Sequence, residues 1–246
     1  MMSSLLVDIG NTNIKSGMCS DGEIQAHKDF STVCGDLAEV FEQNWLSDGE
    51  RPERVLVSNV SDVAIVDALA TFSAIHFNVD IEVIRPFKSY KGMTTQYDDP
   101  HRLGVDRWLV SLAAWLKSSG DVCVVDVGTA LTVDIVTSQG VHLGGLIAPG
   151  PSLMKASLLS GTADLECDSF VQVEHFATNT ADAISLGCLS SFGGVFNEVE
   201  TRLQGLGLHD VNWYLTGGGA EAVVAQMRAP FTLVPELVLE GLAQIL

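Results

Sequence analysis

Apolar residues along this chain occur in short runs and helical stripes, separated by polar turns that contain glycine. Residues 5–15 (LLVDIGNTNIK) predict a buried strand that reaches an acid at Asp8, a tight turn at Gly10, and the second strand of a hairpin. The elements expected next are a strand at 23–30, a helix at 36–46 capped by Asp36, a strand at 54–60, a helix at 62–72 and a short strand at 81–84. This order predicts a mixed sheet covered by helices.

A second hairpin of the same kind follows about half a chain later, at residues 122–136 (VCVVDVGTALTVDIV). Asp126 ends its first apolar run, and Gly128 and Thr129 form its turn. Acids, glycines and short hydroxyl side chains are common turn residues, so one copy alone would be an ordinary hairpin. Two copies at this separation favour a duplicated domain, in which each half offers one phosphate loop.

The most regular helical stripe covers residues 104–117, where apolar residues recur with helical spacing. Asp106 and Arg107 lie in its first turn, off the stripe. An acid there is common, but a neighbouring arginine is less expected, so the pair indicates a site. The preceding residues 87–103 are polar and include Tyr97 and several basic residues. They fit either a solvated linker or a substrate lid.

The second half contains two further glycine-rich junctions. Residues 141–151 fit either a ligand-binding turn or a tight corner before a helix from about residue 152. A strand at 212–216 leads into Gly217, Gly218 and Gly219, where backbone can approach a planar or anionic group. The remaining expected elements are a helix at 180–203 capped by Thr180 and an apolar helix at 235–246.

Composition narrows the possible functions. With 47% hydrophobic and 18% charged residues among 246, the chain is expected to be globular. Its formal net charge of −18 opposes binding to nucleic acid and to anionic membranes. A phosphate-binding protein this acidic must gather cations locally, and bound metal ions are one solution. No apolar stretch is long enough to span a bilayer and no secretion signal is evident, so a cytoplasmic protein is expected.

The spacing of the cysteines and histidines does not match that of zinc-binding motifs. The five cysteines lack CxxC spacing and are expected to be reduced thiols, and the six histidines form no paired motif. The cysteines are Cys19, Cys34, Cys123, Cys167 and Cys188. No Walker A loop, dinucleotide fingerprint or nucleophile elbow is present.

Taken together, these stretches resemble the type III pantothenate kinases of the acetate/sugar kinase, Hsp70 and actin superfamily. The match runs almost from end to end. The segments that carry it are DIGNTNIK (8–15), Tyr97 followed by DDPHRLGVDRW (98–108), DVGTALTVD (126–134), GGLIAPGPSLMKASL (144–158), NTADAISLG (179–187) and LTGGGA (215–220).

The resemblance implies two duplicated actin-like (ribonuclease H-like) α/β domains, at residues 1–118 and 119–246, with an active-site cleft between them. It implies ATP-dependent phosphorylation of pantothenate to 4'-phosphopantothenate, the first step of coenzyme A biosynthesis. The implied cofactors are Mg²⁺ and a monovalent cation, K⁺ or NH₄⁺. A homodimer is also implied, and we place its surface on the helix from Gly104 and the loop before it.

The resemblance also assigns roles to residues. Asp106 would be the general base, Asp126 would bind the monovalent cation, and Asp8 would arrange Mg²⁺ through water. The ATP-binding residues would be Asp8, Ile9, Gly10, Asn11, Thr12, Asn13, Ile14, Lys15 and Thr129. The pantothenate-binding residues would be Tyr97, Gly104, Val105, Asp106, Arg107 and Thr180. Gly217 to Gly219 would lie near the adenosine.

Two other functions fit the same fold. Relatives of these kinases have been described as accessory factors for transcription, which would make the chain a binding module without catalysis. The presence of Asp8, Asp106 and Asp126 argues against this, because a binding module does not need all three acids. Alternatively, the chain acts on another small hydroxyl substrate or is a phosphohydrolase; the match of residues 97–107 to the pantothenate enzymes disfavours both.

Overall fold

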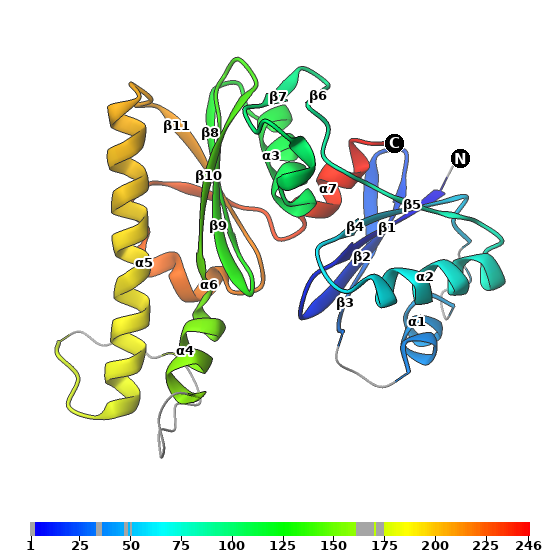
Figure 1. Cartoon of the computed structure of the whole chain (residues 1–246), viewed down its shortest axis with the longest axis horizontal. Helices are drawn as coiled ribbons and strands as arrows, with labels where there is room; N and C mark the ends of the chain where they lie inside the picture. Colours follow the sequence, from blue (N-terminus) through cyan, green and yellow to red (C-terminus); the bar gives the residue numbers. More distant parts are fainter. Residues whose placement is uncertain (1–2, 33–35, 47–48, 50, 161–169, 171–174) are drawn as a thin grey trace. The chain divides into compact units, whose positions relative to one another are not determined.

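A computed structural model describes residues 3–32, 36–46, 49, 51–160, 170 and 175–246. The chain divides into two compact units, each described separately below. Unit 1 comprises Met1–Lys117 together with Glu236–Leu246, and unit 2 comprises Ser118–Pro235. Figure 1 shows their strands and helices in chain order by colour.

Unit 1 is built on a five-stranded sheet in the order β3-β2-β1-β4-β5. Strands β1, β2 and β3 form an antiparallel meander, whereas β4 and β5 run parallel to β1. The elements are β1 (Ser3–Ile9), β2 (Asn13–Ser20), β3 (Glu23–Ser31), α1 (Leu37–Trp45), β4 (Arg54–Asn59), α2 (Val63–His76) and β5 (Ile81–Val83). The predicted first hairpin and the mixed sheet are confirmed.

An aromatic cluster fixes the helices of unit 1 on the sheet. Phe41 and Trp45 of α1 stack with ring centroids 4.8 Å apart, and Phe72 of α2 packs edge-on against Phe41. The Trp45 Nε1–H group donates to the Ser16 hydroxyl at 2.9 Å, so the buried indole keeps a hydrogen-bond partner. The aromatic side chains bury a large apolar area, which stabilises the packing of the two helices.

Aspartates begin both helices, as the sequence predicted for α1. The Asp36 carboxylate accepts a hydrogen bond from the Ala38 N–H group, and Asp62 accepts one from Ala64, each at 2.9 Å. Helix α2 continues to His76, four residues beyond its predicted end. A bidentate pair from Arg54 to Glu82 links β4 to β5, and this hydrogen bonding lowers the pKa of Glu82.

Residues 87–103 form local secondary structure, although most of their side chains are exposed. They contain the hairpin β6 (Ser89–Tyr90) and β7 (Met93–Thr95) and the 3₁₀ turn η1 (Pro100–Arg102). Met93 is buried, and the Tyr90 ring stacks on Phe87 and lies 5.8 Å from Trp108. The Phe87 and Tyr90 rings therefore connect this hairpin to Trp108 of the following helix.

That helix, α3 (Val105–Lys117), packs against α7 (Leu237–Ala243) inside unit 1. Residues 236–246, which the sequence analysis assigned to the second half, thus belong to the compact unit of the first. The two helices pack closely at Gly241. A Cβ at this position would lie only 2.5 Å from the Leu109 carbonyl oxygen. Most residues of α3 are buried within the chain.

In the described part of unit 2 the strands lie side by side in the order β10-β9-β8-β11-β12. Its elements are β8 (Asp121–Val127), β9 (Ala130–Val136), β10 (Val141–Pro149), α4 (Pro151–Ser160), α5 (Thr180–Gly205), β11 (Val211–Thr216), α6 (Ala220–Val223), η2 (Val224–Gln226) and β12 (Phe231–Leu233). Helix α5 covers the core face through Leu189, Phe192 and Phe196, which pack with the apolar residues of β8 and β9.

The two units repeat one topology. In each, the first strand pairs antiparallel with the second and parallel with the fourth, and the fifth strand lies parallel at the edge. Asp8 and Asp126 occupy the same position near the end of the first strand, beside Ser58 and Thr216 respectively. The predicted duplication of a mixed α/β unit is confirmed.

Buried polar groups in unit 2 are paired. His142 Nε2 lies 2.9 Å from Asp134 Oδ1, with both side chains almost fully excluded from water. Burial, with a further contribution from the negative charge of Asp134, raises the pKa of the Cys123 thiol well above its usual value. The side chains of Cys19, Cys123 and Cys188 are buried, and Cys34 and Cys167 lie outside the described residues.

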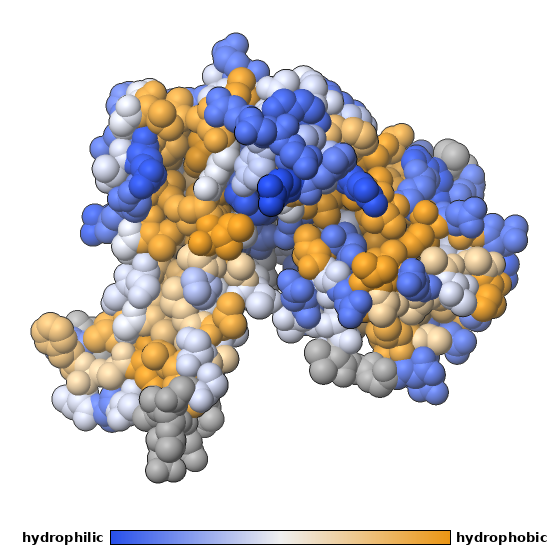
Figure 2. All heavy atoms as spheres, in the orientation of Figure 1, coloured by the Kyte–Doolittle hydropathy of each residue, from blue (hydrophilic) through white to orange (hydrophobic). Residues whose placement is uncertain are grey.

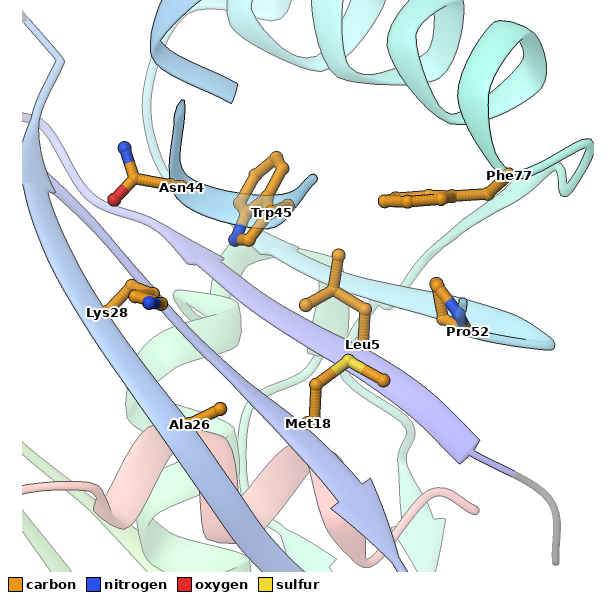
Figure 3. A pocket seen from close by; sticks show the side chains of 8 residues that line it. All are labelled: Leu5, Met18, Ala26, Lys28, Asn44, Trp45, Pro52 and Phe77. Atoms are coloured by element: carbon orange, nitrogen blue, oxygen red, sulfur yellow. The ribbon is translucent and has the colours of Figure 1, made fainter. Parts of the chain in front are cut away.

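Two surface features lie away from the strand ends. A small pocket in unit 1 opens between the sheet and α1 (Figure 3) and is lined by Leu5, Met18, Ala26, Lys28, Asn44, Trp45, Pro52 and Phe77. Leu153 and Leu158 are exposed on α4, where Figure 2 shows hydrophobic surface. Across the described parts of the chain, no helix is both long and apolar enough to traverse a bilayer.

We expect Gly241→Ala to lower the free energy of unfolding by about 1–3 kcal/mol, because the methyl group would overlap backbone atoms of Leu109. Urea denaturation measures this. In Gly194→Ala, on α5, the new methyl group meets no atom within 4 Å, and stability should rise by about 0.5–1 kcal/mol. Equal stability of Gly241→Ala and the wild type would contradict the close α3–α7 contact.

Candidate functional site

In unit 1 a carboxylate lies where the central strand ends. Residues Leu5 to Val7 of β1 are buried, whereas the side chain of Asp8 is half-exposed. The Ser58 hydroxyl, on the neighbouring strand β4, donates to Asp8 Oδ1 at 2.8 Å. The strand thus delivers an oriented acid to its carboxyl end, the edge at which open α/β sheets commonly bind ligands.

The loop after Asp8 is closed by its own backbone and held from one side. The Gly10 N–H group donates to the Asn13 carbonyl at 2.9 Å. Both the backbone N–H and the hydroxyl of Thr32 donate to the Thr12 carbonyl at 2.9 Å, and the same hydroxyl reaches the Asn11 carbonyl at 3.2 Å. Thr32 therefore satisfies the carbonyl oxygens of Asn11 and Thr12 by hydrogen bonding. Such oxygens would otherwise repel a phosphate.

The predicted ATP-binding residues divide by exposure. Asn11 and Thr12 are exposed, so their side chains are open to a ligand. Ile9 and Ile14 are fully buried and can offer a ligand only backbone groups. Asn13 donates from its side-chain amide to Asp29 at 2.8 Å, which anchors the loop to β3. Lys15 lies opposite Asp8 in the β1–β2 register and is half-exposed.

Unit 2 presents the matching loop. Asp126 is half-exposed near the end of β8, and the Gly128 N–H group donates to the Ala130 carbonyl at 2.9 Å, which closes the turn. Gly128 and Thr129 are exposed at its tip. Thr129 therefore lies on the surface of unit 2, in the turn that follows Asp126.

Close backbone packing surrounds this second loop. Gly150, just before α4, donates its N–H to the Thr129 carbonyl at 2.9 Å, and a Cβ there would overlap the carbonyl oxygens of Gly128 and Thr129. Gly217, with φ of 92°, leaves no room for a Cβ beside Asp126 Oδ1 and Val127 O. The two glycine-rich junctions thus pack their backbone directly against residues 126–129. Only glycine, which has no side chain, permits so close an approach.

Asp106 lies in the first turn of α3 and folds back on the preceding glycine. Its Oδ1 accepts the backbone N–H of Arg107 at 2.8 Å, and a Cβ on Gly104 would come within 2.6 Å of the same oxygen. The helix N-terminus favours the ionised carboxylate. The Asp106 carboxylate therefore lies against the Gly104 backbone, and Val105 between them is buried.

Arg107 and Tyr97 are also adjacent. The guanidinium is buried, with 6% of the residue exposed, and its Nη1 donates to the Tyr97 hydroxyl at 3.2 Å. The Tyr97 carbonyl accepts a hydrogen bond from Lys88 at 2.7 Å. Tyr97 is therefore contacted by two cationic side chains, Arg107 at its hydroxyl and Lys88 at its carbonyl.

The prediction that Thr180 caps α5 is wrong. The cap is Asn179, whose side-chain oxygen accepts the Asp182 N–H at 2.9 Å and whose amide donates to the Asp182 carboxylate at 2.6 Å. Asparagine and threonine both favour this position, so sequence alone does not separate them. Thr180 is exposed at the start of the helix and its hydroxyl is not needed as the cap.

The donor set fits cations brought in with a phosphate ligand. Among the described residues, no group of three or more His, Cys, Asp or Glu side chains could hold a metal alone. Mg²⁺ typically binds one or two carboxylates together with substrate phosphates and waters, which suits the half-exposed Asp8. Asp126 offers oxygen ligands in the same way.

Comparison with known proteins identifies the family. The family profile described as type III pantothenate kinase matches residues 4–202. The chain belongs to the type III pantothenate kinase family.

Members of the type III pantothenate kinase family match nearly the whole chain. The type III pantothenate kinase of Nitrosomonas eutropha is 33% identical over 245 residues, covering 98% of this chain and 93% of the relative. That of Alkalilimnicola ehrlichii is 34% identical over 242 residues, covering 98% and 96%.

Two solved structures share the fold. A Campylobacter jejuni protein assigned to the Baf family of transcriptional activators has a TM-score of 0.59 at 23% identity, covering 98% of this chain and 96% of its own. The ethanolamine utilization protein EutJ of Carboxydothermus hydrogenoformans has a TM-score of 0.56 at 13% identity, covering 99% and 90%. At these identities the likeness concerns the fold alone, and it agrees with the predicted two-domain α/β class.

Sequence reasoning missed several residues of the site in this pantothenate kinase family member. Ser58 and Thr32 hold Asp8 and the first loop, yet neither belongs to a motif with known chemistry. Gly150, which packs on the second loop, was noted only as part of a glycine-rich junction. Their contacts join positions 20 to 50 residues apart or depend on tight backbone packing. A serine ending an otherwise apolar strand (RVLVSN) was the one available signal, for Ser58.

Thr32→Val should loosen the first loop without unfolding unit 1. The change keeps the side-chain shape but removes the hydroxyl that bonds Asn11 and Thr12, at a cost of about 0.5–1.5 kcal/mol. Hydrogen exchange of the Gly10 amide should accelerate. Thr71→Val, which removes an exposed helix hydroxyl bonded to Asp67, is the control and should leave that amide unchanged. Unaltered Gly10 exchange in Thr32→Val would show that the hydroxyl does not hold the loop.

Proposed function

We propose that this protein phosphorylates pantothenate with ATP to give 4'-phosphopantothenate, the first step of coenzyme A biosynthesis. The observation that carries the proposal is family membership over residues 4–202, supported by relatives with this name that match nearly the full chain. The geometry supports it too, since the two loops and the Asp106 turn present the groups that phosphoryl transfer requires.

In this proposal the ATP phosphates contact both hairpin loops. Residues 8–15 offer backbone N–H groups and the exposed side chains of Asn11 and Thr12. Thr129 supplies the matching hydroxyl from unit 2. Buried Ile9 and Ile14 act by fixing the hairpin in the core, and Gly217 to Gly219 accommodate the adenosine by close backbone approach.

The cations are assigned to the two strand-end acids. Asp8 arranges Mg²⁺ through water, and Asp126 binds a monovalent cation, K⁺ or NH₄⁺. Bound cations of these kinds neutralise charge on the transferring phosphoryl group. The chain has a formal net charge of −18 and few basic residues, so bound cations are needed to supply positive charge at the phosphates.

Pantothenate is proposed to bind along residues 97–107 and Thr180. The positive charge of Arg107, buried beside Tyr97, suits the substrate carboxylate or the transferring phosphoryl group. Gly104 and Val105 shape the start of α3 so that Asp106 folds over it. The exposed Thr180 hydroxyl offers a further hydrogen bond.

The reaction then follows from these positions. The terminal hydroxyl oxygen of pantothenate attacks the γ-phosphorus in line, and the bond from that phosphorus to the β,γ-bridging oxygen breaks. The hydroxyl proton passes to a carboxylate oxygen of Asp106, and ADP leaves with the bridging oxygen. Asp106 can serve as this base because the helix N-terminus and the Arg107 N–H favour its ionised form.

The alternatives have weaker support. Likeness to a transcriptional activator rests on a structure at 23% identity and concerns the fold alone. A different small substrate or a phosphohydrolase would not require the match that the family profile makes through residues 97–107. The homodimer expected for the family remains part of the proposal.

Asp106→Asn should lower kcat at least about a hundredfold, because the amide keeps the shape but cannot accept the proton. The measurement is ATP-dependent formation of 4'-phosphopantothenate with Mg²⁺ and K⁺. Asp67→Asn, an exposed neutralisation on α2, is the control and should match the wild type. Activity surviving in Asp106→Asn would rule out this base. No turnover by the wild type with either cation would overturn the proposed function.

Asp126→Asn should raise the K⁺ concentration needed for half-maximal activity by about tenfold or more, since the residue loses its charged oxygen ligand. Titrating KCl at fixed Mg²⁺ measures this. Asp121→Asn neutralises an acid at the other end of β8 and should leave the K⁺ response unchanged. An unaltered K⁺ response in Asp126→Asn would remove this residue from the cation site.

A further inference from the structure

Ser58 has an unusual environment for a hydroxyl side chain. It lies on β4, next to the central strand, and is completely excluded from solvent. Its hydroxyl donates to Asp8 Oδ1 at 2.8 Å, across a separation of 50 residues. A buried hydroxyl costs free energy unless it is hydrogen-bonded, and a bond to a charged acceptor is stronger than a neutral one. The pair therefore restricts the carboxylate to one orientation.

The duplicated unit provides an internal comparison. Thr216 occupies on β11 the position that Ser58 has on β4, directly beside Asp126. Its hydroxyl donates at 3.3 Å to the Pro235 carbonyl. The same strand position thus carries a hydroxyl in both units, but the hydroxyl is directed at the carboxylate in unit 1 and at a backbone carbonyl in unit 2.

The residue that follows differs in a complementary way. After Thr216 comes Gly217, whose backbone approaches Asp126 too closely for any Cβ. After Ser58 comes Asn59, whose side chain accepts the Ser61 N–H at 3.0 Å and forms a local turn. Asp126 is therefore packed against backbone, whereas Asp8 is oriented by a side-chain hydrogen bond.

We propose that Ser58 is a positioning residue that orients the Asp8 carboxylate toward the water shell of Mg²⁺–ATP. The inference rests on the proposed function, because that assigns Asp8 to the magnesium-bearing phosphates. Mg²⁺ demands nearly ideal octahedral geometry and retains several waters. A carboxylate that bonds those waters must hold its rotamer, and hydrogen-bonded supporting residues supply this constraint in metal sites.

The test is calorimetric binding of the non-hydrolysable analogue AMP-PNP, with saturating Mg²⁺ and with EDTA, in the absence of pantothenate. Ser58→Ala should weaken binding of the Mg²⁺ complex about tenfold, the lower end of the usual effect of such residues. Binding of the metal-free nucleotide should change little. In turnover assays, the Mg²⁺ concentration for half-maximal rate should rise by a similar factor.

Ser73→Ala is the matched control. Ser73, on α2, is also a fully buried serine of unit 1. Its hydroxyl donates to the Val79 carbonyl at 2.7 Å and not to a carboxylate. The Ser73→Ala variant should be less stable than the wild type but should bind the Mg²⁺ complex of AMP-PNP with unchanged affinity. If Ser58→Ala does not fold, Ser58→Cys keeps the side-chain size with a much weaker donor and should show the same selective loss. Unchanged affinity in the folded Ser58 variant, or an equal loss in Ser73→Ala, would overturn the proposal.

The outcomes separate this inference from the proposed function. If the wild type binds the Mg²⁺ complex but does not phosphorylate pantothenate, the proposed function is wrong. The comparison of Ser58→Ala with the wild type can still be made by binding. Wild-type protein that phosphorylates pantothenate, with Ser58→Ala equal to it in Mg²⁺ dependence, defeats only the role of Ser58. Absence of any nucleotide binding by the wild type defeats both.

Discussion

Each unit of this protein places a negative charge near the end of a strand that is otherwise excluded from water. Burying an isolated carboxylate is costly, and the side chains of Asp8 and Asp126 are only partly buried. Ile9 and Val127, which follow them and end the two strands, are again fully buried. Each acid thus lies at the margin of its core, one residue before the strand ends.

The same framework holds its two acids by different means. Unit 1 uses a buried hydroxyl against Asp8, and unit 2 uses glycine backbone against Asp126. A hydrogen bond from a side chain fixes the direction of the Asp8 carboxylate, whereas close backbone packing limits the space around Asp126. The duplication has therefore diverged in the supporting residues while the acids themselves are retained.

Local signals in the sequence predicted much of this arrangement. The two hairpins, the helix of Asp106 and the Asp36 cap depend on neighbours within a few residues, and all are confirmed. The strand β10 was missed because Gly144 and Gly145 interrupt its apolar pattern, at a bulge that only pairing with β9 explains. Ser58 and Thr32 were missed because their partners lie on other strands, and no local pattern encodes a long-range hydrogen bond.

The packing of α7 on α3 also has a consequence for how the chain is assembled during synthesis. Unit 2 is continuous, whereas unit 1 receives its last helix only after all of unit 2 has been translated. Until then the Leu109 face of α3 lacks its neighbour and stays open to chaperones and to wrong partners. The ribosome therefore delivers a complete unit 2 before unit 1 can close, so the half that begins first is finished last.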